Sequence, residues 1–261
     1  MQKVLVIGDS CLDVFEYGTC KRICPEAPVP VLTPTTKKEN GGMALNVYTN
    51  LKSLDVSCDI ITNTNKPIKT RYIDETSNHM VIRVDWNDEI ETLDYKTLEL
   101  LDFSKYDAVV VSDYNKGFLE EEQLYFISQS HPLTFLDTKK HMDKWCNDFQ
   151  YIKINEKEYQ TNLTYLNKFY KHNLIVTRGK EDTVLNWHKI KNMKLFPIKN
   201  EHPVRDLTGA GDTFLAGLVA MFIKAQDIQE SIIFANKCAA WAVTQKGVAV
   251  VNMSSIENNK K

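Results

Sequence analysis

The feature that most constrains this chain is the segment Thr-Gly-Ala-Gly-Asp at positions 208–212, which is followed by an apolar run at 214–223. The run is typical of a buried helix, so the two glycines are expected to form a tight turn that opens it. Glycines let successive backbone N–H groups converge, and a helix N-terminus adds the positive end of its dipole. The segment therefore predicts an anion-binding turn with Asp212 beside it. A carboxylate in that place can accept the proton of a hydroxyl group that attacks phosphorus.

The same segment has a simpler explanation. Most glycine-rich turns only connect elements, and Asp212 would then cap the helix. The chain has no Gly-x-x-x-x-Gly-Lys-Ser/Thr pattern, and Phe214 stands where a dinucleotide-binding fingerprint needs its third glycine. The local pattern alone leaves a catalytic turn and a plain helix start open.

Composition indicates one globular domain with small-molecule partners. The 261 residues carry a net charge of −2 with acids and bases interspersed, which argues against nucleic acid and anionic membranes as partners. The six cysteines include no Cys-x-x-Cys pair, as expected for free thiols in a reducing compartment. An apolar segment begins at position 4 without a charged leader, and no apolar run is long enough to span a bilayer. We therefore expect a soluble, cytoplasmic protein.

Apolar segments that end in polar residues recur along the chain and indicate the fold class. They lie at 4–7, 108–111, 133–136, 151–154 and 174–176. Because helical patterns separate the later ones, we expect an α/β fold with a doubly wound, mostly parallel sheet flanked by helices. The polar residues then meet at the carboxyl edge of the sheet, where such folds bind ligands. Taken singly, each of them can equally be a helix cap or a solvated side chain.

The motifs resemble those of a known family. The pattern Asp-x-Thr-Gly-Ala-Gly-Asp-x-Phe at 206–214 is similar to the second signature of the ribokinase-like (phosphofructokinase-B type) carbohydrate kinases, and Gly-Gly-x-x-x-Asn at 41–46 is similar to the first. The resemblance covers nearly the whole chain. It implies a single ribokinase-like kinase domain over 1–261, with a small β lid built from segments near 14–39 and 67–85.

The resemblance also implies roles for individual residues. It makes Asp212 the catalytic base and Gly209, Ala210 and Gly211 the anion hole. Substrate binding falls to Asp9, Asp13, Arg22, Gly41, Gly42, Asn46, Arg83, Asp113 and Lys116. ATP binding falls to Lys139, Asn155, Glu156, Lys157, Glu158, Thr177, Arg178, Gly179, Asn236 and Ala239.

Two cations follow from the same resemblance. Mg²⁺ would be held through water by Asn155 and Glu158, since this ion usually keeps several waters. Members of the family often bind a monovalent cation such as K⁺, and its site matches Asp206, Thr208, Ala242, Gln245 and Gly247.

Two segments narrow the resemblance to the kinases that act on heptose 7-phosphate in lipopolysaccharide precursor synthesis. Residues 22–31 follow their Arg-Ile-x-Pro-Glu-Ala-Pro-Val-Pro-Val segment, and 112–117 follow their Ser-Asp-Tyr-x-Lys-Gly loop. The expected reaction is ATP-dependent phosphorylation of the anomeric hydroxyl of heptose 7-phosphate, giving heptose 1,7-bisphosphate, by a homodimer paired through the lid. The alternatives are a kinase for another sugar or nucleoside, and a catalytically inactive sugar-phosphate-binding protein.

The sequence departs from this pattern in three places. After Asp55 a strand–helix unit of the relatives is missing, which shortens or exposes one flank of the sheet. Thr138 stands where relatives usually have proline. The nucleotidyltransferase domain of the bifunctional heptose enzyme has no counterpart here, so we expect kinase chemistry alone.

Overall fold

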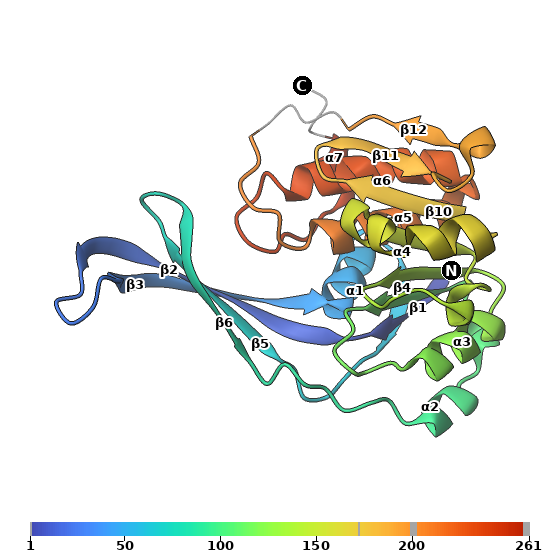
Figure 1. The fold of residues 1–261 in the computed structure, drawn as a ribbon, viewed down its shortest axis with the longest axis horizontal. Helices are drawn as coiled ribbons and strands as arrows, with labels where there is room; N and C mark the ends of the chain where they lie inside the picture. The colour runs from blue at the N-terminus through green and yellow to red at the C-terminus, as the bar shows by residue number, and fades with distance from the viewer. Residues whose placement is uncertain (1, 172, 199–202, 258–261) are drawn as a thin grey trace.

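The computed structural model describes residues 2–171, 173–198 and 203–257 as a body with a projecting lid (Figure 1). The described part of the body contains an eight-stranded sheet in the order β12-β11-β10-β9-β8-β7-β1-β4. Its strands are β1 (Lys3–Gly8), β4 (Ser57–Ile61), β7 (Ala108–Asp113), β8 (Thr134–Thr138), β9 (Tyr151–Asn155), β10 (Asn173–Arg178), β11 (Glu181–Leu185) and β12 (Lys194–Phe196). The neighbouring strands β4, β1, β7, β8, β9 and β10 pair in parallel, whereas β11 and β12 add antiparallel at the far edge. The predicted α/β fold class is confirmed.

Helices cover both faces of this sheet because its central strands are apolar on both sides. On one face Val4 and Val6 pack with α1 (Ala44–Ser53), α5 (Ala210–Ala225) and α6 (Ile228–Ala242). On the other, Leu5 and Ile7 pack with α2 (Tyr95–Glu99), α3 (Glu121–Ser130) and α4 (Glu156–Phe169). The short helix α7 (Met253–Glu257) and 3₁₀ turns at Phe103–Lys105, Lys144–Cys146 and Ile190–Asn192 complete the described elements. In these ranges no helix is long and apolar enough to cross a membrane.

The lid is a second sheet that leaves the body at the carboxyl edge of β1. Its strands are β2 (Ser10–Ile23), β3 (Pro30–Met43), β5 (Ile68–Asp74) and β6 (His79–Trp86), in the order β3-β2-β5-β6. Phe15, Tyr17 and Ile73 of the lid form a small core with Val248 of the body. This contact fixes the lid beside the N-terminus of α5.

Two local features differ from or extend the sequence prediction. Helix α1 begins at Ala44, after the Gly-Gly pair of the first family signature, because the β2–β3 ladder continues to the pair Ser10 and Met43. Met43 makes the transition with a φ of 61°. Strand β4 lies at the edge of the sheet, and the chain passes from it through residues 62–67 into the lid strand β5.

Candidate active site

The first element of the site is the turn that opens α5. Gly209 is the residue before the helix and has a φ of 78°, a conformation that glycine adopts without the strain of a side chain. The first N–H groups of a helix have no partner within it. The Ala210 N–H donates to Leu207 O, and the Thr213 N–H donates to Gly209 O. The Gly211 N–H has no backbone partner among the described residues. The turn therefore has an N–H group available for an anion, at the positive end of the helix dipole.

Asp212 lies in the first turn of α5 and is held by two distant elements. Its carboxylate accepts hydrogen bonds from Tyr114 Oη (2.7 Å), after β7, and from Asn46 Nδ2 (3.0 Å), on α1. The side chain is buried, and this burial raises the pKa of Asp212 to about 6, although both hydrogen bonds act in the opposite direction. Asp212 is thus mostly ionised at neutral pH but still basic enough to take a proton.

Lys153 and Asp137 form a buried ion pair beside the same turn. Lys153 Nζ lies 2.6 Å from Asp137 Oδ2, and a Cβ atom at Gly211 would lie 3.1 Å from Lys153 Nζ. The second oxygen of Asp137 is buried without a hydrogen-bond partner among the described residues. Lys153, Asp137 and Tyr114 were missed as site residues in the sequence analysis. The available signals were a lysine within the apolar strand segment 151–154 and the place of Tyr114 in the loop motif at 112–117.

Asp13 and Gly42 meet at the root of the lid. Asp13 pairs with Arg71 of β5 at 2.5 Å, and a Cβ atom at Gly42 would lie 2.1 Å from Asp13 Oδ2. Gly41, next to it, packs against Leu45. Of the predicted sugar contacts, Asn46 is bound directly to Asp212, the catalytic candidate.

Asp9 and Asp113 accept hydrogen bonds from the loop that follows β7. Asp9 is fully buried and accepts hydrogen bonds from the backbone N–H groups of Tyr114 (2.5 Å) and Phe118 (3.3 Å). Burial, followed by the neighbouring Asp113, raises the pKa of Asp9 to about 6. Asp113 accepts a hydrogen bond from Thr138 Oγ1 at 2.6 Å and is also buried. Both carboxylates position the Tyr114 loop in this structure.

The remaining basic substrate candidates are paired with acids or lie far away. Arg83 makes two hydrogen bonds to Asp85 (2.8 and 2.6 Å), and Lys116 contacts Asp88. Arg22 lies nine residues beyond Asp13 on β2, which is about 30 Å at the usual rise of a strand. It is therefore remote from Asp212 within one chain.

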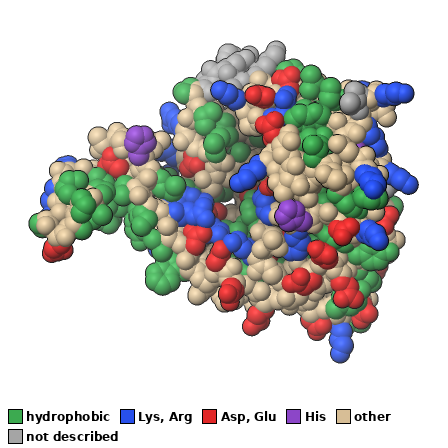
Figure 2. Space-filling view, viewed as in Figure 1, with side chains coloured by type: hydrophobic (Ala, Val, Ile, Leu, Met, Phe, Trp, Pro, Cys, Tyr) green, Lys and Arg blue, Asp and Glu red, His purple; other side chains and the backbone are tan. Residues whose placement is uncertain are grey.

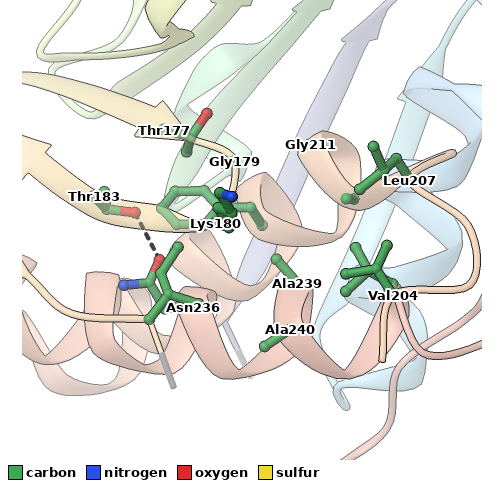
Figure 3. A pocket seen from close by; sticks show the side chains of 14 residues that line it. Thr177, Gly179, Lys180, Thr183, Val204, Leu207, Gly211, Asn236, Ala239 and Ala240 are labelled. Carbon is green, nitrogen blue, oxygen red and sulfur yellow. Dashed lines mark hydrogen bonds between the residues drawn. The ribbon is translucent and has the colours of Figure 1, made fainter. Parts of the chain in front are cut away.

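A cavity of about 350 Å³ extends from the α5 turn between β10, β11 and α6 (Figure 3). Thr177, Gly179, Asn236 and Ala239, all predicted to bind the nucleotide, line it, and Gly211 lies at one end. Asn236 accepts a hydrogen bond from Thr183 Oγ1 (2.7 Å), drawn in Figure 3, so the amide is held against the wall. The cavity is mainly apolar, as suits a flat aromatic base.

Other predicted nucleotide contacts lie outside this cavity. Arg178 is turned toward Glu181 (3.0 Å) and stacks on Trp187. Asn155 and Glu158 form a capping box that starts α4, and Lys139 contacts Glu158. Glu156 and Lys157 lie in the first turn of α4, and both are exposed.

The surroundings of the residues predicted to bind Mg²⁺ and a monovalent cation show whether they fit these ions. The described ranges contain no group of three His, Cys, Asp or Glu side chains suited to direct metal binding. The partly exposed Glu158 carboxylate and Asp137 Oδ1, which accepts no hydrogen bond from the described residues, fit a magnesium ion that keeps its waters. For the monovalent site, Asp206 accepts hydrogen bonds from the N–H groups of Thr208 (2.9 Å) and Gly247 (3.1 Å). Ala242 and Gln245 lie at the end of α6, where the Gln245 N–H donates to Ala242 O.

Comparison with known proteins identifies the class. The pfkB family of carbohydrate kinases matches residues 53–254, and the chain belongs to this family. The family resemblance and the enzyme class predicted from the sequence, a phosphotransferase acting on carbohydrate, are thereby confirmed.

The particular relatives are described as bifunctional proteins. The chain is similar to "Bifunctional protein HldE" of a Nitratiruptor species, with 30% identity over 307 aligned residues that cover 99% of this chain and 65% of the relative. It is also similar to the same protein of Haemophilus influenzae (strain PittGG), with 27% identity covering 98% and 63%. The chain therefore spans slightly less than two thirds of these relatives. An aligned length greater than 261 also means that they carry insertions relative to this chain.

Solved structures show the same fold. Ribokinase from Thermotoga maritima superimposes with a TM-score of 0.74 at 15% identity, covering 99% of both chains. Phosphofructokinase-2 from Escherichia coli, solved with substrates and products, gives a TM-score of 0.75 at 13% identity, covering 99% of this chain and 98% of that one.

Proposed function

We propose that this chain is an ATP-dependent sugar-phosphate kinase that phosphorylates the anomeric hydroxyl of heptose 7-phosphate. The observation that carries the proposal is Asp212, held by Tyr114 and Asn46 at the glycine turn where the nucleotide-sized cavity ends. Similarity to the HldE proteins over almost the whole chain supports heptose 7-phosphate as the acceptor. The product is heptose 1,7-bisphosphate.

In the proposed reaction, the sugar hydroxyl takes the place of the Tyr114 hydroxyl at Asp212 Oδ1. Asp212 accepts its proton as the oxygen attacks the γ-phosphorus of ATP, and ADP leaves. The N–H group of Gly211 and the ammonium group of Lys153 stabilise the negative charge on the phosphoryl group. Glu158 and Asp137 would hold magnesium through water, and the bound ion would supply neutralisation of phosphate charge.

Purified protein, magnesium-ATP and a panel of acceptors test the proposal. We expect phosphorylated product with heptose 7-phosphate, and less with hexose phosphates, ribose and nucleosides. A clear preference for another sugar or a nucleoside would replace the proposed substrate. No product with any acceptor, despite ATP binding, would favour the inactive binding protein.

The pH dependence of kcat/KM reports the state of Asp212 in the free enzyme, where Tyr114 is bound to it. Because the carboxylate must be ionised and its pKa is about 6, kcat/KM should fall about tenfold per pH unit below pH 6. Tyr114→Phe removes a hydrogen bond that favours the ionised form, so its acid limb should shift to higher pH. ATP and buffer titrate identically in the assays of the wild type and of Tyr114→Phe, so a difference between the two pH profiles comes from the enzyme. Identical acid limbs would show that Tyr114 does not change the pKa of Asp212.

We further propose a homodimer paired through the lid, acting in the cytoplasm on a lipopolysaccharide precursor. Apolar side chains lie exposed along the lid (Figure 2). Ile82 and Trp86 are four residues apart on β6, hence on one face, and are 55% and 61% exposed. A second copy can cover this face and bring distant lid residues such as Arg22 to the site of its partner.

Sedimentation velocity tests the lid dimer. We expect the mass of a dimer for the wild type and of a monomer for Ile82→Asp, because a charge would be buried in the paired face. Leu100→Asp, at an 86% exposed position outside the lid, is the matched control and should stay dimeric. A monomeric wild type at micromolar concentration would contradict the proposal.

A further inference from the structure

A second cavity lies between the lid and the body, on the lid side of the loop 204–208. Its volume is about 370 Å³, and its lid wall is formed by Tyr17, Arg71 and Ile73. The body wall includes Arg205, Thr208 and Lys246. Val204 and Leu207 also line the nucleotide cavity, so the loop that carries them separates the two spaces.

Three cationic side chains face this cavity, and two of them have no acidic partner. Arg205 and Lys246 are exposed, and neither makes an ion pair within 4.0 Å among the residues that the structure describes. Arg71 pairs with Asp13 through one terminal nitrogen. Asp206, the only carboxylate among the described residues of the lining, is bound to the backbone N–H groups of Thr208 and Gly247. The cavity therefore has an excess of positive charge.

The other basic residues at the base of the lid, Lys69 and Arg83, already have acidic partners. Lys69 lies 3.0 Å from Asp88 and 3.4 Å from Asp85, and Arg83 is bound to Asp85 through two hydrogen bonds. A second anion at these positions would have to compete with carboxylates already in place. An anion that binds Arg205 and Lys246 would not have to displace a carboxylate.

We propose that Arg205 and Lys246, together with Arg71, bind the phosphate group of the sugar-phosphate substrate; this inference rests on the proposed function. Arginine offers a planar fork of N–H donors that matches phosphate oxygens, and lysine adds a point charge. Arg71 joins this cavity to the sugar side of the site, because the same guanidinium contacts Asp13. A sugar with its reacting hydroxyl at Asp212 can therefore direct the opposite, phosphorylated end into the cavity.

The test compares the wild type with the double variant Arg205→Gln/Lys246→Gln. The variant loses two charge-assisted contacts to the phosphate group, so KM for the sugar phosphate should rise at least about tenfold. The KM for ATP should stay within about twofold, because the nucleotide cavity lies across the loop. Lys37→Gln is the matched control, since Lys37 pairs with Glu39 on β3 and does not line the cavity.

Two further measurements separate this inference from the proposed function. If the wild type phosphorylates no sugar phosphate, the proposed function fails, and calorimetric binding of inorganic phosphate then tests the cavity alone. Loss of that binding in the double variant would still support a phosphate site. If the wild type is active but the double variant keeps its KM for the sugar phosphate, or raises only its KM for ATP, the phosphate site is refuted.

Discussion

Replacing Asp212 by Asn is expected to lower kcat by roughly 10²–10⁴-fold while leaving ATP binding nearly unchanged. Asparagine keeps the size of the side chain but cannot accept the proton of the attacking hydroxyl. The nucleotide cavity touches the turn at Ala210 and Gly211 and extends toward α6, away from the carboxylate. The loss should therefore appear in turnover and not in the affinity for nucleotide.

Single-turnover kinetics and fluorescence titration with an ATP analogue measure these two quantities. Asp227→Asn is the matched control, because Asp227 also stands at a helix start, where it accepts hydrogen bonds from the N–H groups of Gln229 and Glu230. Asparagine caps a helix about as well as aspartate, so this variant should keep its activity. Wild-type turnover in Asp212→Asn would remove Asp212 as the base.

The site was predictable from sequence where its geometry is local. The turn at Gly209 and the helix after it follow from neighbouring residues, and Asp212 follows the turn directly. Tyr114 and Asn46 lie 98 and 166 positions away from Asp212, and no periodicity connects such residues. Only the stacking of β7, α1 and α5 around one edge of the sheet brings them together.

The motif Asn155-x-x-Glu158 shows a second limit of local patterns. The same spacing that is similar to a magnesium-organising motif also satisfies the capping box that starts α4. Both polar side-chain atoms of Asn155 and both carboxylate oxygens of Glu158 take part in hydrogen bonds between these two residues. In this structure the motif starts the helix, and sequence alone does not separate that role from magnesium binding.

The second large effect is expected for Lys153→Met. Removing one partner of a buried ion pair leaves the charge of Asp137 uncompensated, which typically costs about 3–5 kcal/mol of unfolding free energy. Lys139, whose Nζ lies 3.7 Å from the other Asp137 oxygen, should reduce this loss. Kinase activity should fall as well, because Lys153 Nζ is the cation beside Gly211. Urea unfolding and steady-state kinetics measure the two losses.

The double variant Asp137→Leu/Lys153→Met separates the stabilising role of this pair from its catalytic role. Replacing both charges by apolar side chains removes the uncompensated carboxylate, so most of the unfolding free energy should return. Activity should not return, since the cation beside the anion-binding turn is still missing. Asp137→Asn keeps Lys153 and shows how much of the loss of activity comes from removing the Asp137 carboxylate. If the double variant recovers both stability and turnover, Lys153 serves only the fold, and the charge on the transferring phosphoryl group is stabilised by the α5 turn without it.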